Sequence, residues 1–316
     1  SVACYVPRGK GSFPSVVLMT TIPAVVAGVP RIGILTPPGP DGRVDSATLV
    51  AARQAGVTEI YKSGGAQAVA AAAYGTATIP KFDKIVGPGS PWVVAAKRLL
   101  ADEIDPGTPA GPSESIVFAD HTADGRLAAL DLIIESEHGP DSSAFLVTSS
   151  MEVADRAMKA IPDYWQSLGE TRKKFSATVL CGPHGGIVLA RDEDACIRFI
   201  NDYAPEHLMI HSREPFKYLG AVKHAGEILL GQHTPLTLGN YVLGPNAVLP
   251  TSGAARTHSP LGVHDFLKTT GIGYVTSGAY ELLAKHAHTL AVYEGFDGHA
   301  LAVSELRKSF GRMSEH

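Results

Sequence analysis

The feature that most constrains the fold is a regular alternation of short apolar stretches with stretches of helical spacing. The alternation runs from residue 30 to 100 and is repeated from residue 115 to 200. Strands that alternate with helices form parallel β/α units, because each parallel connection must cross back over the sheet. The sequence therefore predicts an α/β protein with two Rossmann-like parallel α/β domains and a small C-terminal helical segment. The expected strands are 30–37, 59–62, 84–86, 115–119, 144–148, 177–181 and 186–189, and the expected helices are 46–55, 64–74, 92–100, 125–137, 151–160, 193–200, 278–291 and 301–310.

The same alternation predicts the domain organisation. A length of 316 residues fits about two domains, which we place at residues 1–112 and 113–262, with a helical segment at 263–316. Residues 232–260 are rich in Gly, Pro, Thr and Asn and are too long for an ordinary connector. Long loops inside compact domains tend to be functional.

Composition excludes several classes of protein. Hydrophobic residues make up 45% of the chain and charged residues 18%, which is enough to build a sizeable core. The net charge of −4 gives no reason to expect nucleic acid or an anionic membrane as a partner. The three cysteines are too few and too scattered for a disulfide framework, so we expect a reducing, cytoplasmic compartment. No apolar run reaches the ~18 residues of a membrane span, and no signal peptide is recognisable.

The first stretch that suggests chemistry is 135–141, Glu-Ser-Glu-His-Gly-Pro-Asp. Glu135 and His138 stand at i and i+3, so on a helix they project from one face about 5–6 Å apart. Gly139 and Pro140 cannot continue that helix. An oxygen donor beside an imidazole is half of a divalent metal site, and a solvated helix end is the alternative interpretation.

Two further pairs join a carboxylate to an imidazole. Glu206 and His207 are adjacent and follow a proline, which suits an acid/base pair with pKa values set by burial. A surface Glu-His pair is the alternative. Glu294 and His299 are separated by glycines, so we expect a loop that can direct both side chains toward one point.

Glycine-rich turns at Gly64–Gly65 and Gly87–Gly89 follow predicted strands and precede predicted helices. Parallel sheets bind nucleotide phosphates on the backbone N–H groups of such turns. Neither turn matches GxGxxG, so plain tight turns are the alternative.

Taken together, these stretches resemble the histidinol dehydrogenase family over almost the whole chain. The resemblance implies an NAD-dependent, zinc-binding homodimer that oxidises a primary alcohol through an aldehyde to a carboxylate. Family members normally have a further N-terminal region, which we expect to be absent here. The motifs that carry the resemblance are 5–7, 64–67, 84–89, 110–114, 137–142, 203–208 and 295–299.

The family pattern also implies roles for individual residues. Glu206 and His207 match the catalytic acid/base pair. The implied zinc ligands are Glu135, His138, Asn240 and His299, with His299 supplied across the dimer. The implied substrate contacts are Ser113 and Glu294, and the implied cofactor contacts are Tyr5, Gln67 and Ser90.

The sequence departs from the family pattern at four of its positions. The family usually has Gln and Asp as oxygen ligands where this chain has Glu135 and Asn240, so the ligand set keeps one negative charge. Ala247 replaces a His that contacts histidinol, and Ser90 replaces an Asn of the cofactor loop. These changes predict a metal site that is retained and a substrate other than histidinol.

Among known relatives, a sulfopropanediol dehydrogenase-like paralogue fits these departures best. It would oxidise 2,3-dihydroxypropane-1-sulfonate to 3-sulfolactate, with Arg256 and His258 as candidates to bind the sulfonate. Arg256 could instead only order its loop. The competing interpretation is the oxidation of L-histidinol to L-histidine.

In the expected mechanism zinc orients the alcohol and His207 accepts its proton as hydride leaves for NAD⁺. Glu206 then activates water on the aldehyde. Interpretations from other classes are a metal-dependent hydrolase that uses no dinucleotide and an inactive zinc-binding scaffold.

Overall fold

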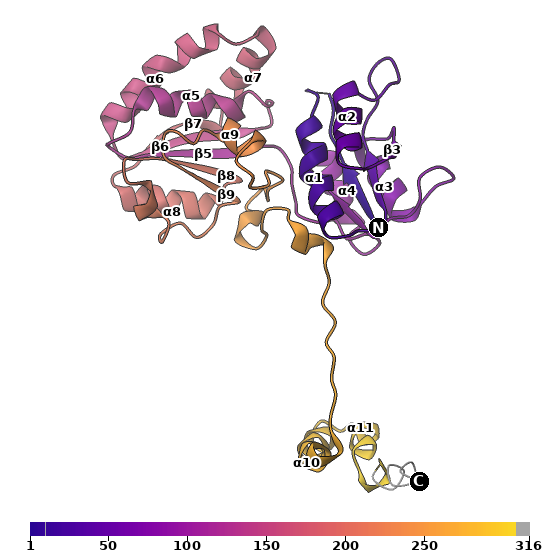
Figure 1. Cartoon of the computed structure of the whole chain (residues 1–316). Helices are drawn as coiled ribbons and strands as arrows, with labels where there is room; N and C mark the ends of the chain where they lie inside the picture. Colours follow the sequence, from indigo (N-terminus) through magenta and orange to yellow (C-terminus); the bar gives the residue numbers. More distant parts are fainter. Residues whose placement is uncertain (10, 308–316) are drawn as a thin grey trace. The chain divides into compact units, whose positions relative to one another are not determined.

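The computed structural model describes residues 1–9 and 11–307 and divides the chain into two compact units (Figure 1). The first unit, Ser1–Leu267, contains two parallel β-sheets, and the second, Lys268–His316, is helical in its described part. The predicted fold class, two parallel α/β layers with a small C-terminal helical segment, is confirmed. No described helix is both long and apolar enough to cross a membrane.

The first sheet has the strand order β3-β2-β1-β4, with every pair parallel. Its strands are β1 (Val2–Tyr5), β2 (Ile32–Leu35), β3 (Glu59–Tyr61) and β4 (Lys84–Val86), and its helices are α1 (Pro14–Val26), α2 (Ser46–Gln54), α3 (Gly65–Tyr74) and α4 (Pro91–Leu99). Successive side chains of a strand point to opposite faces. Val2 and Cys4 of β1 accordingly join the core cluster that includes α1 and α2 residues, whereas Ala3 and Tyr5 join the cluster with α3 and α4. Both faces of this sheet are therefore buried.

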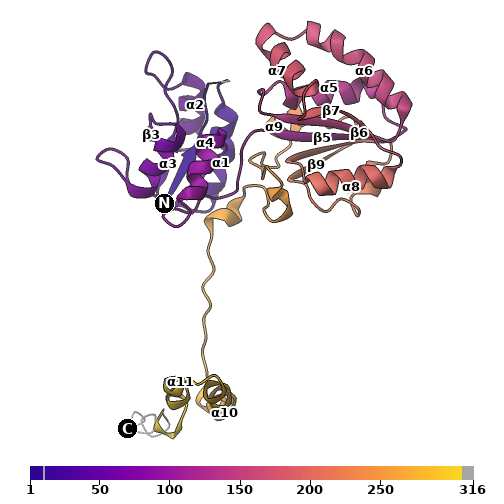
Figure 2. The ribbon, with the colours of Figure 1, turned by 180° about the vertical axis from the view of Figure 1, so that it is seen from behind.

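The second sheet has the order β7-β6-β5-β8-β9 and is also entirely parallel. Helices α5, α6 and α7 cover one face and α8 covers the other (Figure 2). The strands are β5 (Glu114–Ala119), β6 (Ser143–Thr148), β7 (Gly185–Leu189), β8 (His207–His211) and β9 (Glu227–Leu230), and the helices are α5 (Gly125–Ser136), α6 (Met151–Gln166), α7 (Glu170–Leu180) and α8 (Glu193–Tyr203).

One predicted strand is a helix. Residues 177–181, with adjacent Thr and Val, were expected to be extended, but they form the end of α7 and its cap, Cys181. The buried positions of α7 are Ser176 and Val179, which are three residues apart and therefore share one helix face. Packing of that face overrides the weak β propensity of a short β-branched stretch.

Three strands are absent from the sequence-based assignment. β1, β8 and β9 have four or five residues each, and β8 and β9 begin with the polar residues His207 and Glu227, which interrupt the apolar pattern. Two of them are nevertheless interior strands, because β1 pairs with β2 and β4, and β8 pairs with β5 and β9. His207 is consequently the first residue of a strand.

The long segment after β9 connects the two layers. It contains the short helix α9 (Leu236–Tyr241) and then returns to the first layer, where Val248 and Leu261 join the core cluster of β1 and α1. The hydroxyl of Thr251 accepts the N–H of Gly111 at 2.8 Å, so this segment also fixes the connection between the sheets. Part of the sequence assigned to the second domain thus completes the core of the first layer.

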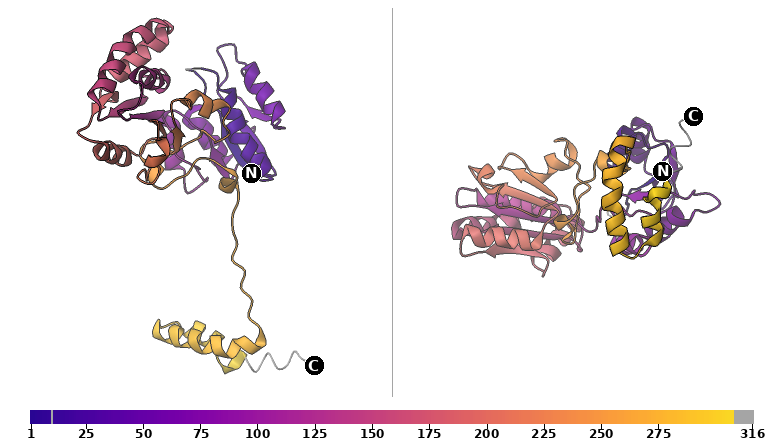
Figure 3. Two further views of the ribbon diagram at one scale, coloured as in Figure 1. Left: turned by 60° about the vertical axis from the view of Figure 1, so that its left-hand side comes forward. Right: turned by 90° about the horizontal axis from the view of Figure 1, so that it is seen from below.

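The second unit contains α10 (Ser277–Tyr293) and α11 (Asp297–Ala302), which lie side by side (Figure 3). α10 confirms the helix expected at 278–291. The helix expected at 301–310 is wrong in its bounds, because α11 already begins at Asp297, an acidic residue of the kind that stabilises a helix N-terminus. Residues 308–310 of that prediction lie outside the described residues.

Candidate functional site

The side chains with acid/base chemistry gather where the strands of the second sheet begin, which we call the amino edge. Glu114, His207 and Glu227 are the first residues of β5, β8 and β9, and Glu206 directly precedes β8. In the register of the sheet His207 stands beside both Ser115 and Glu227. Since parallel strands begin at the same edge, residues far apart in the chain become neighbours here.

A strained turn leads the chain into this edge. Ala204, at the C-terminus of α8, has the left-handed backbone conformation with φ 56°, which is uncommon for a residue other than glycine. It is completely buried, so its surroundings hold it there. The turn directs Pro205 and Glu206 back toward the sheet, and such strain is characteristic of functional sites.

His207 is held by a carboxylate, that of Glu227, which no sequence motif marks. Its Nδ1 lies 3.0 Å from Oε2 of Glu227, and both side chains are buried. The ionised carboxylate can only accept, so Nδ1 carries the proton and donates it. The second ring nitrogen, Nε2, is then available as a proton acceptor and lies 3.8 Å from Oε1 of Glu206.

Glu206 is buried, and its Oε2 accepts the backbone N–H of Glu114 at 2.9 Å. Burial, together with the negative charges of Glu135 and Glu114, raises the pKa of Glu206 despite the opposing effect of His207. Burial by itself would lower the pKa of His207, but the charges of Glu206, Glu227 and Glu135 outweigh it and raise the pKa. Each group therefore holds a proton more tightly than it would in free solution, and each acts as a base only after it has lost that proton.

The C-terminal end of α5 brings Glu135 and His138 to the same edge. Glu135 is 1% exposed, and its Oε2 has no hydrogen-bond partner among the described residues. The Nδ1 of His138 lies 2.9 Å from the carbonyl oxygen of Ile134, to which it can donate, and Nε2 has no hydrogen-bond partner among the described residues. Imidazoles that bind metal are commonly oriented in this way by a backbone carbonyl. A buried carboxylate oxygen without a donor, beside such an imidazole, fits a zinc ion.

Helix α9 places Asn240 in the same region. α9 contacts α5, and a side chain on Gly239 would approach Oε1 of Glu227 to 3.2 Å. The neighbouring residue Asn240 is half-buried. The structure therefore brings the segment of a third predicted ligand toward Glu135 and His138.

Glu135, Glu206 and Glu227 lie around His207, and Glu114 lies beside Glu206; we refer to these four residues as the glutamate cluster. Oε1 of Glu114 accepts the N–H of Ser252 at 2.9 Å. Three members of the cluster, Glu114, Glu135 and Glu227, each have one buried oxygen with no partner among the described residues. A buried polar atom without a partner costs about 1–3 kcal/mol, and more when it is charged. The cluster is therefore prepared to receive cations or hydrogen-bond donors. Ser113, a predicted substrate contact, directly precedes this cluster in the chain.

The predicted cofactor contacts lie at the opposite, carboxyl edge of the first sheet. The phenol of Tyr5, at the end of β1, accepts the N–H of Gly65 at 2.9 Å, at the start of α3. The Gln67 side chain lies against the same glycine. The strand order changes direction between β1 and β4, and ligands of open α/β sheets bind at such a point.

A buried lysine supports the second glycine turn at this edge. Lys97, which is 4% exposed, donates to the carbonyl oxygen of Gly87 at 2.9 Å. Gly87 has φ 108°, and a Cβ there would lie 2.2 Å from the carbonyl oxygen of Tyr5. Ser90 ends the turn as the exposed N-cap of α4. The sequence-based prediction gave Lys97 no role. Its place among the apolar positions of a helix is nevertheless visible in the sequence and indicates a buried lysine.

The predicted anion contacts do not join the glutamate cluster. The guanidinium of Arg256 donates to the backbone carbonyls of Asp202 and Gly253, and Nδ1 of His258 bonds to the hydroxyl of Thr257. Both Arg256 and His258 are exposed. These contacts order the loop that contains Arg256 and His258.

Glu294 and His299 lie in the second unit and are exposed. They are not on one loop as expected, because Glu294 caps α10 and His299 is inside α11, with its ring 5.1 Å from that of Phe296.

A different group of potential ligands, Asp120, His121 and Glu193, lies where β5 ends. The ammonium of Lys217 approaches Asp120 at 3.8 Å and Glu193 at 3.6 Å. A lysine already neutralises these carboxylates, so the group is better explained as an ion-pair network than as the zinc site.

Comparison with known proteins identifies the family. The model of the family described as histidinol dehydrogenase matches residues 1–307. The chain belongs to the histidinol dehydrogenase family. It is 64% identical over 310 residues to a "Histidinol dehydrogenase homolog" of Cereibacter sphaeroides, covering 98% of this chain and 70% of that protein. It is 52% identical over 305 residues to a "Histidinol dehydrogenase" of Synechocystis sp., covering 96% of this chain and 70% of that protein.

The same relationship is visible in three dimensions. The crystal structure of histidinol dehydrogenase from Elizabethkingia anophelis superimposes with a TM-score of 0.92 at 34% identity, over 98% of this chain and 71% of that one. The predicted family is thereby confirmed, as are its cofactors, NAD and Zn²⁺. The family consists of NAD-dependent oxidoreductases, so the chain is assigned to that class.

Proposed function

We propose that this histidinol dehydrogenase family member oxidises a primary alcohol with a cationic substituent, through an aldehyde, to a carboxylate. L-histidinol is the first candidate substrate. The observation that carries the proposal is the glutamate cluster, whose ion pairs among the described residues are with histidines. The unpartnered oxygens of Glu114 and Glu227 are suited to accept N–H donors of a substrate.

Zinc, held by Glu135, His138 and Asn240 together with a fourth ligand, would supply a Lewis acid for the alcohol oxygen. The unpartnered carboxylate oxygens of Glu114 and Glu227 would remain beside the substrate. Two unit charges 4 Å apart interact by about 4 kcal/mol at an effective dielectric constant of 20, so a permanent anion would be disfavoured here.

The oxidation of 2,3-dihydroxypropane-1-sulfonate is the competing candidate. Ala247, in place of an imidazole, favours it because it removes a contact expected for histidinol. Against it stands the geometry of Arg256, whose guanidinium is already bonded to two backbone carbonyls.

We assign the chemistry of the chain's own groups as follows. Nε2 of His207 would accept the hydroxyl proton of the alcohol, and bound NAD⁺ would supply the acceptor for the hydride. Glu227 keeps the other ring nitrogen protonated and the ring in place. Glu206, whose pKa is raised by burial, accepts a proton from water during the oxidation of the aldehyde.

We further propose that the active form is a homodimer in which His299 and Glu294 serve the site of the partner subunit. The support is an apolar surface on α10, where Leu282, Leu290 and Tyr293 are 66%, 61% and 88% exposed. Large exposed apolar side chains on one helix are characteristic of a protein interface.

The decisive experiment compares substrates on the zinc-loaded protein. L-histidinol and 2,3-dihydroxypropane-1-sulfonate are assayed side by side for formation of NADH, and a higher kcat/KM for histidinol is expected. A higher kcat/KM for the sulfonate would overturn the charge assignment. Formation of no NADH with either of them or with a wider panel of alcohols would favour a hydrolase or an inactive zinc-binding scaffold.

A further inference from the structure

The second sheet has another edge that the proposed reaction does not use. Its order, β7-β6-β5-β8-β9, changes direction between β5 and β8, because the chain proceeds from β5 to β6 and β7 on one side and continues with β8 on the other. In open α/β sheets, ligands bind outside the carboxyl ends of the strands at this kind of position. The glutamate cluster lies at the amino edge, so the carboxyl edge is free for a separate ligand.

A cavity is present at this position. It has a volume of ≈ 380 Å³ and adjoins a second hollow of ≈ 510 Å³. Ligand pockets typically measure about 300–1,000 Å³. The two share Thr122 and Ala123, which follow β5, Arg213, which follows β8, and Arg156 of α6.

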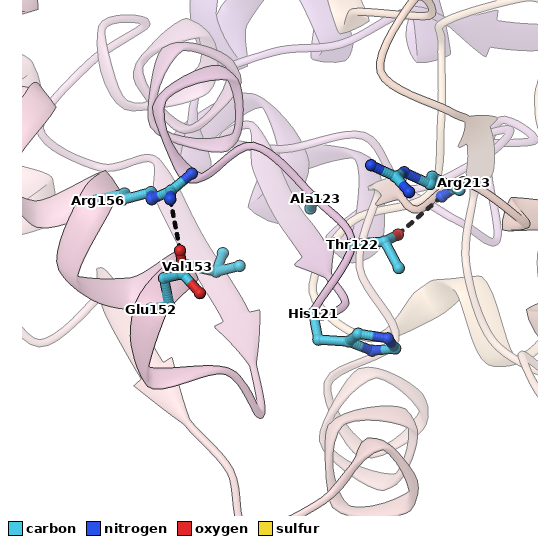
Figure 4. Close-up of a pocket in the computed structure, with 7 residues that line it drawn as sticks. All are labelled: His121, Thr122, Ala123, Glu152, Val153, Arg156 and Arg213. Atoms are coloured by element: carbon cyan, nitrogen blue, oxygen red, sulfur yellow. Dashed lines mark hydrogen bonds and ion pairs between the residues drawn. The ribbon is translucent and has the colours of Figure 1, made fainter.

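Two guanidinium groups line the cavity from different elements (Figure 4). Arg156 forms an ion pair with Glu152 at 2.5 Å. The guanidinium of Arg213 has no hydrogen-bond or ion-pair partner within residues 1–9 and 11–307. The backbone of Arg213 is nevertheless fixed, because its N–H donates to the hydroxyl of Thr122 at 3.0 Å, and that hydroxyl donates to Asp120 at 2.6 Å. The backbone of Arg213 is thus fixed, while no described residue neutralises the positive charge of its side chain.

Close packing of two helices builds the wall of the cavity. A Cβ on Gly125, at the start of α5, would lie 2.3 Å from the carbonyl oxygen of Val153 and 2.9 Å from Cβ of Arg156. Only glycine permits this approach, which brings the N-terminal ends of α5 and α6 together. Helix N-termini carry partial positive charge. Asp124 already accepts the N–H of Arg126, and Arg156 is paired with Glu152, so Arg213 supplies most of the attraction for an anion.

We propose that this cavity binds a small phosphomonoester, with Arg213 as its principal contact and Arg156, which is paired with Glu152 of the same cavity, as a second contact. Guanidinium groups bind phosphate oxygens through two parallel hydrogen bonds, and an anion near the N-termini of two helices gains further stabilisation. The phosphate could belong to a separate ligand or to the dinucleotide. The cavity lies at the second sheet, whereas the predicted cofactor contacts Tyr5 and Gln67 belong to the layer of the first sheet. This separation favours a separate ligand.

The test uses the full zinc-loaded chain and inorganic phosphate or glycerol 3-phosphate as probes. Isothermal titration calorimetry at constant ionic strength is expected to show saturable binding that weakens at least tenfold in Arg213→Gln. Arg53→Gln removes an exposed arginine of the first layer and is the matched control, with unchanged binding expected. Circular dichroism and the melting temperature of each variant show that it is folded.

Steady-state kinetics separate the two sources of phosphate. Arg213→Gln is expected to leave kcat and the KM for NAD⁺ unchanged, which supports a separate ligand. A raised KM for NAD⁺ would overturn that assignment. The proposal fails if neither probe binds saturably or if Arg213→Gln binds them as well as the unmodified protein does.

Discussion

Replacing Glu227 by glutamine perturbs the geometry on which the proposed reaction depends. The substitution keeps the size of the side chain but replaces the carboxylate that holds Nδ1 of His207 at 3.0 Å. An amide can present either its oxygen or its NH₂ group to the imidazole, so the proton of the ring is no longer confined to Nδ1. Nε2 would then act as the proton acceptor in only part of the molecules.

The size of the effect follows from the hydrogen bond. A hydrogen bond to a charged group contributes about 1.5–3 kcal/mol. Since about 1.4 kcal/mol corresponds to a factor of ten in rate, kcat for the alcohol should fall roughly 10- to 150-fold. The KM for NAD⁺ should change little, because the predicted cofactor contacts are on the first sheet. Glu227→Asp keeps the charge and should recover part of the rate.

The control uses a similar pair at the other end of β8. Nε2 of His211 lies 2.7 Å from Oδ2 of Asp131, and both side chains are buried. Asp131→Asn should lower the melting temperature but leave kcat almost unchanged. If Asp131→Asn lowers kcat as much as Glu227→Gln does, loss of stability explains both results. An unchanged kcat in Glu227→Gln would refute the positioning role outright.

Further predictions concern the metal, the acid/base pair and the cofactor turn. His138→Ala should lose the stoichiometric zinc that metal analysis finds in the unmodified protein, and retention of that zinc would refute the ligand assignment. His207→Asn should lower turnover by about 10²–10⁴ with zinc still bound, whereas Glu206→Gln should impair oxidation of supplied aldehyde more than oxidation of the alcohol. Burial, aided by the charge of Lys84, lowers the pKa of Lys97 to about 7 from 10.5, so the unfolded chain binds a proton that the folded chain releases between these values. The free energy of unfolding should therefore rise with pH across this window, and chemical denaturation of Lys97→Met should show a flatter rise.

Sequence reasoning recovered the features that are local in the chain. The alternation of strands and helices is a pattern of neighbours, and the adjacent pair Glu206 and His207 is visible without a fold. Glu227 could not be found in this way, because it follows His207 by a whole strand and connection and reaches it only through the parallel register of β8 and β9. The role predicted for Arg256 considered its charge alone, whereas the partners of its guanidinium are backbone carbonyls that no sequence pattern shows.

The register of β8 limits which changes in chain length this family member can tolerate. His207 and Glu227 pair across β8 and β9, and the left-handed turn at Ala204 fixes where β8 begins. Side chains of a strand alternate between its two faces, so a shift of one residue would turn His207 away from Glu227. An insertion between Ala204 and His207 should therefore abolish the reaction, whereas an insertion at exposed Gly220, between the two strands, can be absorbed without moving either strand.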